Sequence, residues 1–82
     1  MSREEVLEYL NELCRELFFD DDLVVTEDTV ASDVEGWDSL GHLELISEIE
    51  NHYNIKFTMG EIQGFANVGE LVDVILKRIQ KK

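Results

Sequence analysis

Apolar residues recur at helical spacing in three stretches of this 82-residue chain, and no proline interrupts any of them. The stretches are 3–18, 39–53 and 67–79, and in each one the apolar side chains fall on one side of a helix. The chain is therefore predicted to fold as an all-α bundle of three main helices. A chain of this length has room for one small core, so a single domain over residues 1–82 is expected.

The first predicted helix has a start signal in its sequence. Ser2 and Glu5 have the spacing of a capping box, in which each side chain accepts a hydrogen bond from the other residue's backbone N–H. The helix is therefore expected from about residue 3 to residue 18. Cys14, the only cysteine, falls within the apolar stripe of this helix, which favours a place in the core over thiol chemistry and excludes an internal disulfide.

The second helix is expected to begin at Ser39 or Leu40 and to end at Tyr53, and the next residue, Asn54, suits a left-handed helix end. Successive residues lie about 100° apart around a helix axis, which divides this helix into a core face and an exposed face. The predicted core face holds His42, Leu45, Ile46, Ile49 and Tyr53, and the predicted exposed face holds Leu40, Leu43, Glu44, Ser47, Glu48 and Asn51.

The C-terminal third predicts a short helix and then a long one. Thr58 and Glu61 form a second capping-box pattern before a helix from Met59 to Phe65, which two glycines weaken. The last helix is expected to start at Asn67. Its C-terminal end is basic and complements the negative pole of the helix, through Lys77, Arg78, Lys81 and Lys82.

A long connection, residues 19–37, joins the first two helices. Structureless loops of this length are uncommon in compact domains, so apolar anchors and one short turn at Ser32 to Glu35 are expected to hold it. The expected anchors are Leu23, Val24, Val25, Val30, Val34 and Trp37. The three aspartates at 20–22 do not begin an EF-hand calcium loop, because that pattern needs an acid or amide at position 24 and glycine at position 25.

The charge of the chain limits its partners. The formal net charge is −12 at pH 7, and residues 1–76 hold three basic side chains against all 19 acidic ones, which leaves −16 on that part. Such a surface repels nucleic acid and anionic membranes and attracts proteins with basic patches. The charged N-terminus is no secretory signal, and no apolar run approaches the ~20 residues of a membrane span. A cytoplasmic monomer is therefore expected.

The tripeptide Asp38-Ser39-Leu40 lies where the acidic loop meets the second helix. Helix starts prefer Ser and Asp, so the tripeptide alone is also explained as an ordinary N-cap. A serine hydroxyl at this place would lie beside free backbone N–H groups and the positive pole of the helix dipole, where an anion is stabilised.

In its wider context the stretch Gly36 to Ile46 resembles the phosphopantetheine attachment motif of acyl carrier proteins. The resemblance runs from the first helix to Ile79 and includes the segments 55–57 and 68–71. It implies three main helices, one short helix and a long first loop. Trp37 stands where fatty-acid carriers have a small residue, and Gly41-His42 where an acid and a threonine are usual, which favours a specialised pathway over housekeeping fatty-acid synthesis.

The resemblance also implies a function. Ser39 would bear a covalent 4′-phosphopantetheine arm, with Asp38 and Leu40 completing the motif that a phosphopantetheinyl transferase recognises. The protein would not be an enzyme but would hold an acyl or aminoacyl cargo as a thioester for lipid biosynthesis or secondary metabolism. Its other partners would be a loading enzyme and an acyltransferase or synthase with basic docking patches. The implied docking face consists of Leu40, Leu43, Glu44, Ser47 and Glu48.

Other functions explain fewer residues. A serine hydrolase would need glycine in place of Trp37 and a base held by a third group, and one cysteine with two separated histidines makes no metal site. An unmodified acidic adaptor that binds one protein through its second helix remains the alternative. His42 lies one turn after Ser39, either as an uncharged core residue or at the mouth of an apolar cleft for the cargo.

Overall fold

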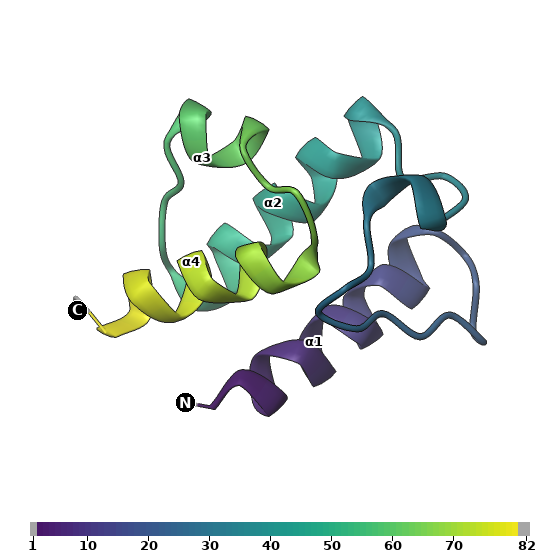
Figure 1. The fold of residues 1–82 in the computed structure, drawn as a ribbon, viewed down its shortest axis with the longest axis horizontal. Helices are drawn as coiled ribbons and strands as arrows, with labels where there is room; N and C mark the ends of the chain where they lie inside the picture. The colour runs from purple at the N-terminus through teal and green to yellow at the C-terminus, as the bar shows by residue number, and fades with distance from the viewer. Residues whose placement is uncertain (1, 81–82) are drawn as a thin grey trace.

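The structure is a computed structural model that describes residues 2–80, and within that range it contains four α-helices and one 3₁₀ turn. The elements are α1 (Arg3–Leu17), η1 (Ala31–Asp33), α2 (Ser39–Tyr53), α3 (Met59–Gln63) and α4 (Val68–Gln80). Helix α1 packs against both α2 and α4, and the short α3 bridges the end of α2 and the start of α4 (Figure 1). The predicted all-α fold of three main helices and one short helix is confirmed.

The predicted capping residues define the helix ends. In the first box the backbone N–H of Glu5 donates to Ser2 Oγ (3.2 Å), and the backbone N–H of Ser2 donates to Glu5 Oε1 (3.1 Å). Thr58 and Glu61 form the same reciprocal pair at the start of α3. Asn54 ends α2 with a left-handed φ of 55°, as predicted.

Several boundaries differ from the prediction by one or two residues, including the end of α1 at Leu17 and the start of α4 at Val68. Helix α3 ends at Gln63 and not at Phe65, because Gly64 takes the cap position and the Phe65 ring turns inward, edge-on to Phe57. The short turn in the long loop is η1, which begins one residue before the predicted Ser32. Lys81 and Lys82, which were expected to extend the basic end of α4, lie outside the described residues.

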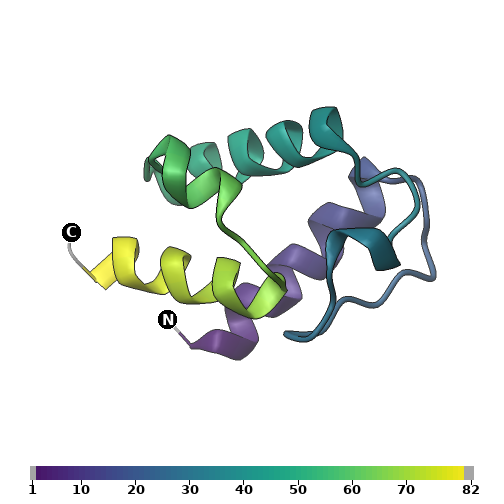
Figure 2. The same cartoon turned by 45° about the horizontal axis from the view of Figure 1, so that its top comes forward.

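The core is formed by side chains from α1, α2, α4 and two of the connections. Figure 2 shows α1, α2 and α4 surrounding this centre. The buried apolar residues are Val6, Leu10, Leu13, Cys14, Val25, Val34, Leu45, Ile46, Ile49, Ile55, Phe57, Val68, Leu71, Val72 and Ile75. Burial raises the pKa of the Cys14 thiol to about 11, so this side chain stays an uncharged thiol and packs as an apolar group, as predicted.

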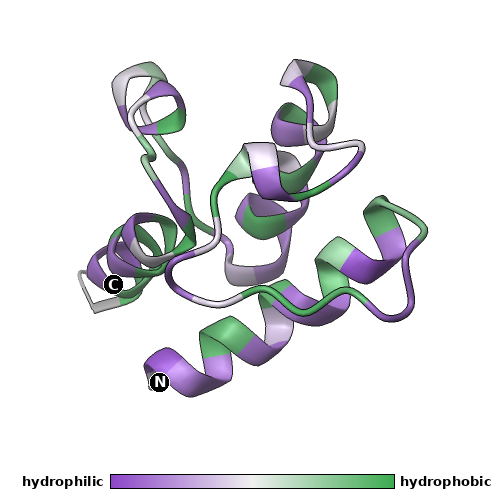
Figure 3. Cartoon of the chain, turned by 45° about the vertical axis from the view of Figure 1, so that its right-hand side comes forward, coloured by the Kyte–Doolittle hydropathy of each residue, from purple (hydrophilic) through white to green (hydrophobic). Residues whose placement is uncertain are grey.

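Hydrogen bonds as well as apolar contacts hold the long loop in place. Val25 is buried, and its backbone N–H and C=O both pair with the side-chain amide of Asn11 on α1 (2.8 and 3.0 Å), where the loop runs along α1 (Figure 3). The carbonyls of Glu27 and Thr29 accept from the first N–H groups of α4 (both 2.8 Å). The loop thereby satisfies donors that a helix start leaves free.

Four of the six predicted apolar anchors of the loop pack in or against the core, whereas Val30 is half-buried outside the core cluster and Val24 is exposed. Val34 is buried, like Val25, and Trp37 packs against the core cluster together with Leu23. Val24 was expected to be an anchor, but its side chain is exposed because the extended backbone at this point turns alternate side chains to opposite sides. No helix within residues 2–80 combines the length and the apolar character of a bilayer span.

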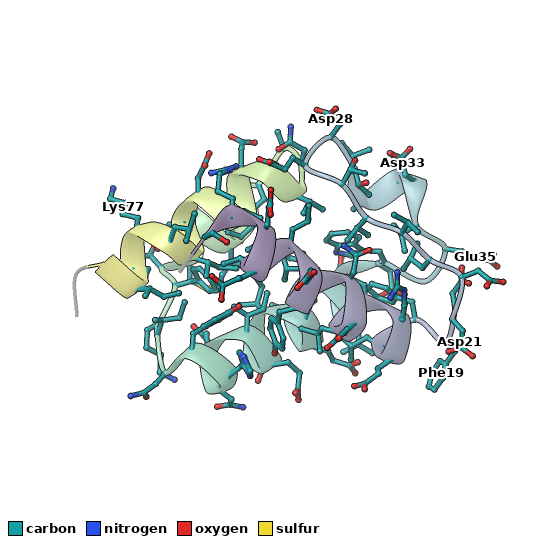
Figure 4. All side chains as sticks on the ribbon, turned by 90° about the horizontal axis from the view of Figure 1, so that it is seen from below. Phe19, Asp21, Asp28, Asp33, Glu35 and Lys77 are labelled. Carbon is teal, nitrogen blue, oxygen red and sulfur yellow. The ribbon has the colours of Figure 1, made fainter. Side chains whose placement is uncertain are left out.

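Negative charge lines the outer edge of the long loop. Figure 4 shows Asp21, Asp28, Asp33 and Glu35 there, with Lys77 at the opposite end of the molecule. The ion pairs among the described residues are Arg3 with Glu27, Arg3 with Asp73, and Arg78 with Glu61. Most of the acidic side chains in the described part of the chain thus have no cationic partner to offset their repulsion.

We expect added sodium chloride to raise the melting temperature between low salt and ~0.5 M, where the screening length is well under 10 Å. Screening weakens the repulsion within the −16 charge of residues 1–76, and the exposed ion pairs that it also weakens contribute little to stability. Thermal unfolding followed by circular dichroism measures the shift. A flat or falling melting temperature would mean that the acidic side chains are too far apart to destabilise the fold.

Candidate functional site

The start of α2 is built around Asp38 and not around Ser39. Asp38 has an extended backbone, and its Oδ1 accepts a hydrogen bond from the backbone N–H of Gly41 (2.8 Å), which makes Asp38 the N-cap. Ser39 is the first helical residue and is exposed. Of the two residues in the tripeptide that could serve as the N-cap, Asp38 and not Ser39 occupies the capping position. The Ser39 hydroxyl is left without a structural role.

A tight turn delivers the chain to this helix start. Gly36 has a φ of +91°, a conformation that residues other than glycine rarely adopt. The Trp37 N–H donates to the carbonyl of Val34 (3.2 Å). The Asp38 N–H then donates to the Gly36 carbonyl (3.0 Å). The turn leaves the backbone N–H groups of Ser39 and Leu40 without a partner among residues 2–80.

Gly41 is buried at the point where this turn meets α2. A Cβ atom on Gly41 would lie 2.8 Å from the carbonyl oxygen of Gly36 and 3.0 Å from Cε1 of Phe18. Any side chain at position 41 would collide with the backbone of the turn. This contact gives a physical reason for the glycine at position 41, where an acidic residue is usual in fatty-acid carriers.

His42 connects the turn to α3 through both ring nitrogens. Its Nδ1 accepts from Trp37 Nε1–H (3.1 Å), and its Nε2 lies 2.8 Å from the carbonyl oxygen of Ile62. Because the indole can only donate and the carbonyl can only accept, the neutral imidazole carries its proton on Nε2. His42 was expected either in the core or at the mouth of an apolar cleft, and the structure combines features of both. Its ring is half-buried and hydrogen-bonded, and it also lines an open groove.

An open groove of about 630 Å³ begins at Ser39 and runs between α2 and α3. Its lining is mostly apolar and includes Trp37, His42, Leu43, Met59 and Ile62. Behind Trp37, His42 and Phe65 a smaller cavity of about 40 Å³ extends toward α4. A long apolar group tethered near Ser39, such as an acyl chain, could lie in this groove.

The predicted docking residues lie together on the exposed side of α2. Leu40 is 67% exposed and Leu43 is 52% exposed, and Glu44, Ser47 and Glu48 are exposed beside them. The sequence analysis missed Met59, which is 66% exposed on the first turn of α3 and lines the same groove as Leu43. The sequence could have indicated this exposure, because Met59 directly follows the Thr58 cap and the first turn of a short helix is mostly exposed.

The helix start suits a phosphodiester. The exposed Ser39 hydroxyl lies beside the free N–H groups of residues 39 and 40, at the positive pole of a helix of 15 residues. The groove that opens beside it, with a volume of about 630 Å³, offers room for a chain of methylene and amide groups. The residues present thus fit a phosphopantetheine arm, while no group of three or more metal-ligating side chains lies close together in the described part of the chain.

Residues 4–75 match the family model described as "Phosphopantetheine attachment site". The chain belongs to the acyl carrier protein family. Over 78 residues, 95% of this chain and 96% of the relative, the carrier is 28% identical to an acyl carrier protein of Thermotoga maritima. It is 44% identical to the holo acyl carrier protein of Geobacter metallireducens, solved by solution NMR, with a TM-score of 0.84 over 92% of this chain and 86% of that one.

A crystal structure of an acyl carrier protein from Thermotoga maritima has the same fold, with a TM-score of 0.86 and 22% identity over 99% of this chain and 94% of that one. Membership of the family establishes a carrier and not an enzyme, and it establishes 4′-phosphopantetheine as the prosthetic group. Family membership therefore favours a modified carrier over the unmodified adaptor. Family membership does not identify the attachment residue, the cargo or the partner enzymes, which have to be inferred from the residues of this chain.

Proposed function

We propose that Ser39 carries the 4′-phosphopantetheine group and that the chain, as a single carrier domain over residues 1–82, presents an acyl or aminoacyl cargo to partner enzymes. The observation that carries this proposal is the exposed Ser39 hydroxyl on the first turn of α2, capped by Asp38 and open to the groove. When bound, the arm supplies a thiol that holds the cargo as a thioester.

The chain's own residues would contribute binding and orientation. The N–H groups of Ser39 and Leu40 would stabilise the phosphodiester charge, and Asp38 would keep them aligned by holding the helix start. The apolar walls of the groove, including Leu43 and Ile62, would shelter the arm and an apolar cargo from water. A tethered cargo also has a high effective concentration at each enzyme that docks.

We further propose that partner enzymes dock on the exposed side of α2. Leu40, Leu43 and Met59 supply apolar contact area around Ser39, and Glu44 and Glu48 supply negative charge. Apolar anchors within a charged rim are typical of protein interfaces, and the charge would attract Lys and Arg on the partner. The expected partners are a phosphopantetheinyl transferase, a loading enzyme, and an acyltransferase or synthase.

The direct test is the mass of the protein. After incubation with coenzyme A and a broad-specificity phosphopantetheinyl transferase, the intact mass should increase by one phosphopantetheine group, and a peptide map should place the increase on Ser39. An unchanged mass under conditions that modify another carrier protein would contradict the proposal.

We expect the imidazole resonances of His42 to shift when the apo protein is converted to the holo or acyl form. The ring lines the groove three residues from Ser39, about 4.5 Å along the helix axis, and the Trp37 and Ile62 hydrogen bonds fix its orientation. ¹⁵N-resolved spectra should also report the Nε2–H tautomer. His52, which stacks on Tyr9 and does not line the groove, is the internal control. Unchanged His42 resonances in all three forms would assign it a purely structural role.

A further inference from the structure

Phe19 is the most exposed large apolar side chain in the described part of the chain. Its residue is 93% exposed, and Figure 4 places its ring outside the fold at one corner, beside Asp21. Leu43 and Met59, two other exposed apolar side chains, line the groove, whereas Phe19 lines neither of the cavities described above. Folding of the chain alone gives this ring nothing to pack against.

The backbone at Phe19 holds the ring in this position. Its φ is +55°, in the left-handed region, and it ends α1 in the conformation that glycine usually adopts. The N–H of Asp20 donates to the Arg15 carbonyl across this residue (3.1 Å), and the N–H of Phe18 donates to the Cys14 carbonyl (2.9 Å). An aromatic side chain at this position is exposed to water, and its backbone adopts a conformation that non-glycine residues disfavour. The stability of the fold therefore does not explain why position 19 is a phenylalanine.

The corner that carries Phe19 lies next to the start of α2. The side chain of the preceding residue, Phe18, stacks on Trp37 with ring centroids 5.8 Å apart, and it limits the space at Gly41. Gly41 follows Ser39 by two residues. The end of α1 therefore adjoins the turn that presents Ser39, and Phe19 is the apolar side chain that this junction turns toward solvent.

We propose that Phe19 is an anchor for the phosphopantetheinyl transferase that modifies Ser39. The ring enters an apolar pocket of the transferase, and Lys or Arg side chains around that pocket face Asp20, Asp21 and Asp22, all exposed beside the ring. The proposal rests on the assignment of Ser39 as the attachment site.

The transferase is the partner that this position favours. It must bring its reacting groups to the Ser39 oxygen itself, so its contact surface has to cover the residues around that oxygen. Enzymes that act on the cargo meet it at the end of a flexible arm and need not cover this corner. An anchor at the junction of α1 and α2 therefore acts on the modification step and not on the later ones.

The test is the substitution Phe19→Asn, because Asn tolerates the left-handed backbone and the variant should fold at least as well as the parent. Transfer from coenzyme A by a broad-specificity transferase is measured at several carrier concentrations. We expect the KM for the variant carrier to rise about tenfold with kcat unchanged, as for the loss of an aromatic anchor that contributes only to binding. A KM equal to that of the parent overturns the proposal.

Val24→Asn is the matched control. Val24 is 65% exposed in the same loop, but it lies away from the corner that carries Phe19. Its neighbour Val25 pairs with Asn11, which is about 10 Å from Phe18 along α1. The KM of the Val24→Asn variant should equal that of the parent. An equal rise in both variants would mean that any apolar residue of the loop serves, which contradicts an anchor at Phe19.

Replacing the aspartates at 20–22 by asparagine should raise the KM for the carrier at low salt and flatten its salt dependence. A parent protein that is not modified on Ser39 would overturn the attachment site as well, whereas a modified parent with an unaffected Phe19→Asn variant overturns this inference alone.

Discussion

Ser39→Ala is expected to leave the carrier folded and to abolish the uptake of phosphopantetheine. Alanine has no oxygen to form the phosphodiester, so the intact mass should stay that of the apo protein after prolonged incubation with transferase and coenzyme A. The cost in stability should be small, well below the ~1 kcal/mol of a lost N-cap, because Asp38 and not Ser39 caps α2. Circular dichroism before and after heating verifies the fold.

Two substitutions serve as controls for Ser39→Ala. Ser32→Ala removes an exposed hydroxyl from η1, outside the docking face on α2, and should be modified like the parent. Asp38→Ala keeps the Ser39 hydroxyl but removes the cap, so it should lose about 1 kcal/mol of stability while it still becomes modified at a reduced rate. Modification that persists in Ser39→Ala, or that moves to Ser2, Ser32 or Ser47, would contradict the assignment.

The helices and the two faces of α2 were predictable because local sequence determines them. Capping boxes at Ser2 and Thr58 fix helix starts through contacts only three residues apart, and helical periodicity alone separates Leu45 in the core from Leu40 at the surface. The boundaries were accurate to one or two residues for the same reason. The choice of cap for α2 is also local: Asp38 and Ser39 are both good caps, and only the backbone conformation decides between them.

Contacts between distant segments were beyond the reach of the sequence. The carbonyls of Glu27 and Thr29 complete the start of α4, and the Ile62 carbonyl meets His42, but a backbone carbonyl leaves no mark on the amino-acid pattern. The hydrogen bond from Trp37 to His42 joins two residues that were each noted only as departures from the fatty-acid carriers. Of these contacts, the one between His42 and the Ile62 carbonyl joins α2 to α3, the two helices that border the groove beside Ser39.

Gly41→Ala should destabilise the carrier by about 1–2 kcal/mol, although alanine is the better helix former by ~1 kcal/mol at an unhindered site. The added methyl would lie 2.8 Å from the Gly36 carbonyl oxygen, and backbone cannot move aside as a flexible side chain can. The turn from Gly36 to Asp38 would have to shift, and Asp38 with it. Thermal unfolding should show a melting temperature lower by several degrees, because 1 kcal/mol corresponds to about 4–8 °C in a domain of this size.

Gly60→Ala separates this steric effect from helix propensity. Gly60 lies in the first turn of α3, and the nearest atom to an added methyl would be Thr58 Oγ1 at 4.0 Å, an ordinary contact. The same substitution should therefore leave stability unchanged or raise it by up to ~1 kcal/mol. Opposite signs at positions 41 and 60 would show that the glycine after Leu40 is required by the close approach of the turn and not by flexibility at the attachment site. If Gly41→Ala were as stable as Gly60→Ala, the turn before Ser39 would have to be adaptable, and the fixed presentation of its hydroxyl would no longer hold.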